Sequence, residues 1–297
     1  MKILVTGSNG LLGQKLTALF EQDSDVYLIA TAREASVLPI THGEFHTLDI
    51  SNQREVEKVV ALTKPDAIIN TAAMTQVDLC EQERNACWEA NVTAVGNLIA
   101  ACQRNSVHLV HVSTDFIFDG SQELLDEEAI PNPVNYYGKS KLAGEQLILA
   151  SGISWCILRT VLVYGVTRDM SRSNIVLWVK KNLEQGKNIR VVNDQWRTPT
   201  LAEDLASGCA LAATLKATGI YNISGKDYLS IYEIALRTAD FFKLDKSLIT
   251  ETDSTQFTQP AARPMKTGFV IEKARRVLGY EPHSFEGGLE ILASQLR

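Results

Sequence analysis

A tyrosine and a lysine stand four positions apart, at Tyr137 and Lys141, in a segment with helical periodicity. At that spacing both side chains lie on one face of a helix. A free phenol has a pKa of about 10 and is a poor acid–base group at neutral pH, but a neighbouring ammonium favours its phenolate. The pair is therefore suited to give a proton to a carbonyl oxygen while a hydride reaches the carbon. Tyr136, one residue earlier, lacks a lysine four positions on.

Two hydroxyl side chains, Ser113 and Thr114, directly follow the apolar run 108–112, which has the character of a strand. Ligands of parallel α/β sheets lie beyond the carboxyl ends of the strands. A hydroxyl at that place can donate a hydrogen bond to a substrate carbonyl. We therefore predict a catalytic set of Thr114, Tyr137 and Lys141, with Ser113 beside the substrate.

Glycines with the spacing G-x-x-G-x-x-G follow the first apolar run and precede a helical segment. In a strand–turn–helix unit, such glycines permit a tight turn, a close approach of the backbone to a pyrophosphate, and close packing of helix on strand. The start of the helix favours the phosphate charge. The motif predicts a dinucleotide site, with contacts from Gly7, Asn9, Gly10, Leu11, Leu12 and Gly13.

The end of the second predicted strand bears on the choice of cofactor. An acidic residue there would bond the ribose 2′-hydroxyl of NAD, and an arginine would accommodate the extra phosphate of NADP. The strand ends in Thr31 and Arg33, and the first acid, Glu34, comes only afterwards. This favours NADP(H), with NAD(H) as the second candidate.

The positioning elements are short apolar runs that alternate with longer amphipathic ones. Strands are expected at 3–5, 26–30, 44–48, 66–70, 108–112 and 155–159, and helices at 11–21, 53–62, 87–104 and 135–150. Such alternation, with continuously apolar strands, indicates a parallel sheet covered on both faces. Beyond 165 the pattern is less regular, with helices expected at 174–184, 204–215, 231–242 and 272–278, strands at 189–192 and 220–223, and a loop at 254–263.

The predicted fold is therefore α/β, a Rossmann-like doubly wound parallel sheet with a smaller C-terminal α/β lobe. Residues 1–164 are expected to form an NAD(P)-binding domain, rejoined by about 193–218. Residues 165–297 are expected to form mainly a substrate-binding lobe.

Composition narrows the class of protein. The 297 residues carry a net charge of −6 without a basic tract, which argues against nucleic-acid and membrane partners. No segment reaches the roughly 18 apolar residues of a membrane span. The five cysteines are scattered and odd in number, which favours a reducing, cytoplasmic location over a disulfide framework. The five histidines are dispersed, so we expect no metal site.

Nearly the whole chain resembles the extended short-chain dehydrogenase/reductases, and more narrowly the branch of the dTDP-4-dehydrorhamnose reductases. The glycine turn and the Tyr-x-x-x-Lys pair are shared by the whole superfamily. More specific to the branch are the stretches 113–120 (STDFIFDG) and 194–206, which holds Asp-Gln, Pro-Thr and Asp-Leu-Ala.

The resemblance implies roles for individual residues. Thr114, Tyr137 and Lys141 would form the catalytic triad, with Tyr137 as the proton donor. The further cofactor contacts implied are Asp49 by the adenine, Ile50, Thr71, Ala72, Ala73, Asn91, Tyr137 and Lys141. The substrate contacts implied are Val77, Asp78, Ser113, Thr114, Tyr137 and Arg263. The reaction implied is reduction of a 4-keto nucleotide sugar, of the type dTDP-4-dehydro-L-rhamnose to dTDP-L-rhamnose.

The chain departs from this branch at a few places. A sugar-facing tryptophan is expected soon after Thr160, where this chain has Val161 and Leu162. The stretch 165–173 is also unusual, and the C-terminal segment 285–289 lacks a tryptophan before its Glu-Gly. These departures leave the chemistry intact and leave the sugar open.

Two rival readings remain. A nucleotide-sugar dehydratase would need a second carboxylate after Asp115, where Phe116 stands, and an epimerase would carry an acid at the end of the second strand. A non-catalytic NADP-binding subunit, like the regulatory subunit of methionine adenosyltransferase, shares the fold and several motifs. Steady turnover of NADPH separates an enzyme from such a subunit. A homodimer is compatible with the sequence.

Overall fold

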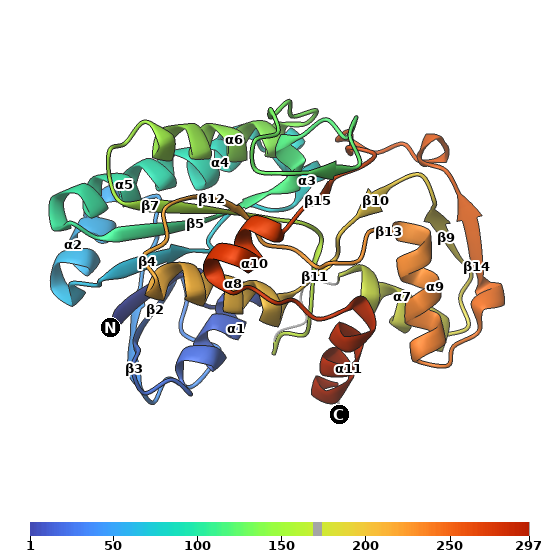
Figure 1. Ribbon diagram of the computed structural model, residues 1–297, viewed down its shortest axis with the longest axis horizontal. Helices are drawn as coiled ribbons and strands as arrows, with labels where there is room; N and C mark the ends of the chain where they lie inside the picture. Colours follow the sequence, from blue (N-terminus) through green and yellow to red (C-terminus); the bar gives the residue numbers. More distant parts are fainter. Residues whose placement is uncertain (169–173, 297) are drawn as a thin grey trace.

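The computed structural model describes residues 1–168 and 174–296, so part of the unusual stretch 165–173 lies outside the described residues. Its centre is a seven-stranded sheet in which all neighbouring strands are parallel, in the order β12-β7-β5-β4-β1-β2-β3 (Figure 1). The strands are β1 (Lys2–Thr6), β2 (Tyr27–Ala32), β3 (Gly43–Thr47), β4 (Ala67–Asn70), β5 (His108–Thr114), β7 (Trp155–Thr160) and β12 (Gly219–Asn222). The predicted parallel α/β fold is confirmed.

Both faces of the sheet are covered by helices, which explains the continuously apolar strands. In β1, Ile3 and Val5 face one core while Leu4 faces the other. The first core lies under α1 (Leu11–Phe20), α8 (Ala202–Thr214) and α10 (Glu272–Leu278). The second lies under α2 (Gln53–Thr63), α5 (Ala94–Asn105) and α6 (Tyr136–Leu149) (Figure 1).

The strand order reverses between β1 and β4, and this is where the sheet can take a ligand. The chain runs from β1 through β2 to β3 on one side, then through β4, β5 and β7 on the other. Nucleotides bind in the crevice beyond the carboxyl ends of strands at such a switch point. The glycine turn after β1, the segment 71–73 after β4 and Thr114 at the end of β5 all lie at that edge.

The remaining elements form a smaller part, at the right of Figure 1. It contains α7 (Ile175–Glu184), α9 (Ile231–Phe241) and α11 (Phe285–Gln295). Two short strand pairs join it, β9 (Ile189–Val192) with β14 (Ile249–Thr252) and β10 (Trp196–Arg197) with β13 (Leu229–Ser230). Its cores are separate from those of the sheet. Between its segments the chain returns to the sheet, where α8 packs near α1 and β12 pairs with β7.

The predicted helix 87–104 is interrupted. It consists of the end of α4 (Arg84–Trp88), a π-helical turn (Glu89–Thr93) and α5. The side chain of Asn91 in the π turn forms hydrogen bonds with both the N–H and the carbonyl of Met74. The interruption of the helix therefore coincides with a contact to the segment that follows β4.

Several elements were not predicted. They include α3 (Val77–Gln82), the start of α4, α11, β14, and the two-residue pairs β6 (Leu124–Leu125) with β15 (Gly268–Phe269), β8 (Val163–Tyr164) with β11 (Thr200–Leu201), and β10 with β13. Strands of two residues are too short to show a period of two. The expected loop 254–263 begins with a 3₁₀ turn (Ser254–Gln256) and is otherwise irregular.

Two negative observations concern the part of the chain that the structure describes. None of its helices combines the length and the apolar character that a membrane span requires. No group of three or more His, Cys, Asp or Glu side chains within it is placed to hold a metal ion. All five cysteines are buried free thiols.

Candidate active site

Helix α6 carries Tyr137 and Lys141, and local contacts fix where it begins. Asn135 caps the helix by accepting a hydrogen bond from the Gly138 N–H at 2.8 Å. A Cβ on Gly138 would lie 2.0 Å from the carbonyl oxygen of Phe116. Only glycine at this position lets the first turn of α6 lie against the turn that follows β5. This contact brings Tyr137 to Thr114.

Tyr137 is buried, and its hydroxyl lies beside that of Thr114. Burial raises the pKa of Tyr137 above its ordinary value, the Thr114 hydroxyl lowers it, and the carboxylate of Asp115 raises it further. The sequence-based expectation was that the ammonium of Lys141 brings this pKa down. In the structure of the chain alone the pKa is raised, because burial outweighs the other effects. Tyr137 therefore holds its proton at neutral pH, as a proton donor must.

Lys141 is also buried, and its ammonium is directed at the end of β5. Its Nζ donates to the carbonyl of Val112 at 2.8 Å and lies 3.2 Å from Nε2 of His111. Burial lowers the pKa of Lys141 to about 8, while the carboxylate of Glu145 and the thiol of Cys87 act in the opposite direction. Lys141 is thus still cationic at neutral pH, close to its point of titration.

His111 is the contact of Lys141 that the sequence did not reveal. It lies inside β5 and is fully buried, and its Nδ1 is 3.0 Å from Nδ2 of Asn70. Burial, and then the charge of Lys141, lower the pKa of His111 well below its ordinary value. His111 is therefore a neutral partner of the ammonium. The sequence signal was a histidine within an apolar strand.

The glycine turn has the close packing that its spacing predicts. Gly7 has a φ of +68°, and a Cβ on Gly13 would lie 2.2 Å from the carbonyl oxygen of Gly7. Helix α1 starts after Gly10 without a side-chain cap, which leaves its first N–H groups available to a ligand. The hydroxyl of Ser8 is buried and has no hydrogen-bond partner among the described residues. This cradle, with one unpaired donor and a helix start, suits a pyrophosphate.

The loop after β2 is held against the glycine turn by Asn9. Its amide donates to the carbonyl of Ala35 at 2.9 Å and accepts from the N–H of Val37 at 3.1 Å. The hydroxyl of Thr31 donates to the carbonyl of Val5 and is buried, so it is not free for a ligand. Arg33 is exposed, and its side chain makes no hydrogen bond or ion pair with the described residues.

A second arginine reaches the same loop. Arg168 donates from Nη1 to the carbonyl of Val37 at 3.4 Å, and its N–H donates to Gln14 at 3.0 Å. Sequence reasoning missed Arg168, because it stands in an irregular stretch more than a hundred residues from the glycine turn. Two guanidinium groups therefore belong to this corner of the molecule.

The remaining predicted cofactor residues lie around the same crevice. Asp49 accepts from the N–H and the hydroxyl of Ser51, and the carbonyl of Ile50 accepts from Asn97. Thr71 donates to the carbonyl of Thr6, beside Ala72 and Ala73.

Asn91 differs from these residues because it is buried. Its side chain links Met74 to Ser140 of α6.

Two predicted substrate residues contact each other. Arg263 donates from both Nη atoms to the two carboxylate oxygens of Asp78, at 2.6 and 2.7 Å, which lowers the pKa of Asp78. Val77 stands beside Asp78 at the start of α3. The hydroxyl of Ser113 is buried and has no partner among the described residues, so it is available to a ligand.

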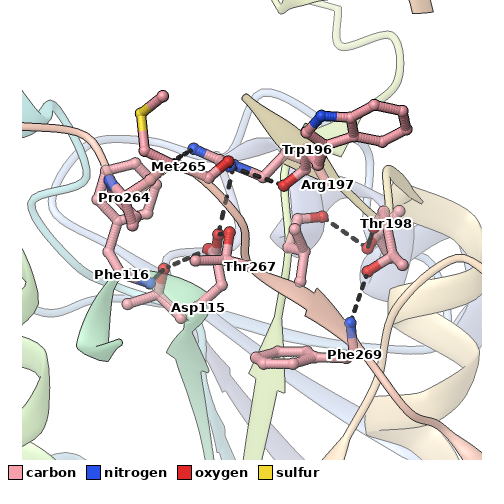
Figure 2. A network of polar contacts seen from close by, with 12 residues as sticks. Asp115, Phe116, Trp196, Arg197, Thr198, Pro264, Met265, Thr267 and Phe269 are labelled. Carbon is pink, nitrogen blue, oxygen red and sulfur yellow. Dashed lines mark hydrogen bonds and ion pairs between the residues drawn. The ribbon is translucent and has the colours of Figure 1, made fainter. Parts of the chain in front are cut away.

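Asp115 joins Thr114 to the smaller part of the molecule, and Figure 2 shows it beside Arg197 and Thr267. Its Oδ1 accepts from the hydroxyl of Thr114 at 3.1 Å, and its Oδ2 accepts from Thr267 at 2.5 Å. The Nε of Arg197 lies 3.7 Å from the same Oδ2. Neither Arg197 nor Thr267 was singled out from the sequence.

Comparisons with known proteins show the family to which the chain is similar over its whole length. A family model described as "RmlD substrate binding domain" matches residues 1–297. A protein from Aggregatibacter actinomycetemcomitans, named dTDP-4-dehydrorhamnose reductase, is 30% identical over 97% of each chain. The methionine adenosyltransferase 2 subunit beta of Bos taurus is 29% identical over 83% of this chain and 73% of its own. The crystal structure of a dTDP-4-dehydrorhamnose reductase from Bacillus anthracis, in complex with NADP, superposes with a TM-score of 0.84, at 28% identity and 99% coverage of both chains.

Proposed function

The chain belongs to the family described as RmlD substrate binding domain, and on that premise we propose that it is an NADPH-dependent reductase of a 4-keto nucleotide sugar. The reaction is of the type dTDP-4-dehydro-L-rhamnose to dTDP-L-rhamnose. The observation that carries the proposal is that Tyr137 lies beside Thr114 at the end of β5 and that the ammonium of Lys141, on the same helix as Tyr137, contacts the end of the same strand, at the edge of the sheet where the glycine turn also lies.

The cofactor is proposed to bind at the crevice between β1 and β4. The N–H groups at the start of α1 and the hydroxyl of Ser8 would receive the pyrophosphate. Ala72 and Ala73 would line the cleft, Asp49 and Ile50 would lie by the adenine, and Lys141 would reach the nicotinamide ribose. When bound, the reduced nicotinamide supplies a hydride. Residues 1–164 with 193–218 would serve the cofactor, and most of 165–297 the substrate.

The preference for NADPH is proposed to rest on Arg33 and Arg168 together. Arg33 is exposed and unpaired among the described residues, and Arg168 approaches the loop that follows it. We expect Arg168→Met to raise the KM for NADPH about tenfold while leaving that for NADH unchanged, because only NADPH carries the 2′-phosphate. Steady-state kinetics with both cofactors measures this. An equal loss with NADH would assign Arg168 to the loop structure instead.

The proton chemistry follows from the chain's own residues. Tyr137 keeps its proton because burial raises its pKa, and it would release that proton to the substrate oxygen as negative charge develops there. The ammonium of Lys141 would then stabilise the phenolate. Ser113, whose hydroxyl has no partner among the described residues, would donate to the same oxygen.

The substrate is proposed to lie over Thr114, beside Val77 and the Asp78–Arg263 pair. Arg263 is the cation suited to the diphosphate, and Asp78 holds it. Of the two residues standing where a tryptophan was expected, Val161 is completely buried in a core, whereas Leu162 is only half-buried. Leu162 is therefore the one proposed to meet the sugar.

A second candidate function is a non-catalytic NADP-binding subunit, and the similarity to methionine adenosyltransferase 2 subunit beta favours it. The assembled Thr114, Tyr137 and Lys141 favour the enzyme, because a binding subunit needs no proton donor. A dehydratase or an epimerase is less well supported, because Phe116 takes the place of the second carboxylate and the end of β2 carries no acid.

The test is NADPH oxidation, followed by absorbance, with dTDP-4-keto-6-deoxy-L-mannose generated in situ and with NADH in parallel. Tyr137→Phe should lower kcat at least about a thousandfold and leave NADPH binding unchanged, because it removes only the proton donor.

The matched control is Tyr136→Phe, at the neighbouring tyrosine that stacks against Trp88 and Arg84, which should keep near-normal turnover. Full activity of Tyr137→Phe would refute the catalytic assignment. Tight NADPH binding without turnover on a panel of keto sugars would favour the regulatory subunit.

A further inference from the structure

The guanidinium of Arg197 is buried at the boundary between the smaller part and the sheet. It comes from β10, and its side chain is 3% exposed. Nη1 donates to the carbonyls of Trp196 and Met265 at 2.7 and 3.1 Å, and Nη2 donates to that of Pro264 at 2.7 Å (Figure 2). The ring of Phe116 lies 6.0 Å away. Three carbonyls fix the group in place, but they are neutral, so its charge needs a separate partner.

That partner is Asp115, whose side chain is also 3% exposed. A carboxylate removed from water in this way is costly unless a cation and hydrogen-bond donors compensate for the lost hydration. Burial raises the pKa of Asp115, while Arg197 and the hydroxyls of Thr267 and Thr114 lower it. Both carboxylate oxygens are occupied from the protein, so Asp115 is held as a fixed acceptor.

The Thr114 hydroxyl has only one proton to donate, and that proton goes to Asp115. Its oxygen accepts from the N–H of Phe116 at 3.2 Å and meets the hydroxyl of Tyr137. The charge state and position of Asp115 therefore decide which way the Thr114 hydroxyl points. The other ionisable groups that face Tyr137 are the thiols of Cys80 on α3 and Cys87 on α4. No cation other than Arg197 acts on Asp115 among the described residues.

We propose that Arg197 is a positioning residue of the catalytic site: it holds Asp115 as an ionised acceptor, and Asp115, by taking the one proton of the Thr114 hydroxyl, fixes the Thr114 oxygen beside Tyr137. A cation from the smaller part thus completes the proposed site at the carboxyl edge of the sheet. The proposal rests on the proposed function for its kinetic test, while the chain of contacts itself is tested without turnover.

The kinetic test compares Arg197→Met, Asp115→Asn and the double variant with the wild type. Arg197→Met should lower kcat about ten- to a hundredfold, with the Kd for NADPH unchanged, because Thr114 loses its orientation while the cofactor cradle is intact. Because Arg197 acts through Asp115, the double variant should be no worse than Arg197→Met alone. Thr267→Val, which removes one donor to Asp115, should give a smaller loss in the same direction.

A pH profile separates positioning from mere support of the fold. Asp115→Asn removes a negative charge that raises the pKa of Tyr137, so the alkaline titration of that phenol should move to lower pH. A residue that only stabilises the fold would lower the amount of active enzyme and leave the profile in place. Arg237→Met is the control, since its ion pair with Glu286 lies on the surface of the smaller part. It should change neither kcat nor the profile.

A crystal structure of the Arg197→Met variant tests the contacts that run from Arg197 through Asp115 to Thr114, even if the protein turns over no substrate. Separation of the Thr114 oxygen from Asp115 beyond hydrogen-bond distance, about 3.5 Å, would support the proposal. An unchanged Thr114–Asp115 contact would overturn it. So would wild-type kcat in Arg197→Met, or additive losses in the double variant. If the wild type reduced none of the sugars, the proposed function would be refuted. The crystal structure of Arg197→Met would then be the test of this inference.

Discussion

The cofactor corner (residues 7–13, 31–37, 49–50 and 71–73) and the contacts that join the two parts of the molecule (Asp78–Arg263 and Asp115–Arg197) are built differently. The corner is made of backbone, with glycines where a Cβ would clash and N–H groups left free at a helix start. The joining contacts are made of charged side chains, and Asp78 and Arg263 are 185 residues apart. A backbone site depends on the residue types within one short segment, whereas a side-chain site depends on the whole fold.

The largest expected effect is at the cofactor corner. Gly13→Ala would place a Cβ 2.2 Å from the carbonyl oxygen of Gly7. Neither atom can move away unless the backbone shifts. We expect the Kd for NADPH to rise about a hundredfold and the free energy of unfolding to fall by about 2 kcal/mol. Cofactor titration and urea unfolding measure the two effects.

The control for this variant is Gly96→Ala, in the interior of α5, where an added Cβ meets nothing within 4 Å. It should leave NADPH binding unchanged and raise the free energy of unfolding by up to about 1 kcal/mol. If Gly13→Ala had the same effects on NADPH binding and on the free energy of unfolding as Gly96→Ala, the cofactor corner would not depend on the close backbone contact at Gly13.

A middle-sized effect is expected at the Asp78–Arg263 pair. Arg263→Gln should raise the KM for the nucleotide sugar about tenfold, because a charge-assisted contact with the diphosphate is lost, and should not change the Kd for NADPH. The swap of both residues, Asp78→Arg with Arg263→Asp, distinguishes two roles. Restored activity would show a purely structural pair, whereas continued loss would show that the substrate needs the cation at position 263.

The smallest effect concerns Lys141, whose ammonium contacts the end of β5. Burial lowers its pKa from 10.5 to about 8, so between these values the unfolded chain holds a proton that the folded chain has released. The free energy of unfolding of the wild type relative to Lys141→Met should therefore rise with pH from about 8 to 10. Over the same interval kcat should fall, because the phenolate of Tyr137 loses its neighbouring cation. Lys139→Met, at an exposed position of the same helix, should keep both profiles of the wild type.

The sequence alone predicted the architecture and the centre of the candidate site. The parallel sheet is confirmed by the structure, and membership of the extended reductase family is confirmed by the family match. The glycine turn, Thr114, Tyr137 and Lys141 could be named because the chemistry depends on spacings within one strand–turn–helix unit or one helix face. Their roles in catalysis stay predictions.

Only the tertiary structure decided which distant side chains complete these local motifs. Arg197, Thr267, Arg168 and His111 carried no periodic signal, and each gains its meaning from a partner on another element. The tertiary structure also reversed one expectation, since burial raises the pKa of Tyr137 although a lysine lies four residues away. Spacing along the chain fixes what neighbours on one element can do, whereas desolvation and ion pairing depend on what the rest of the fold places around them.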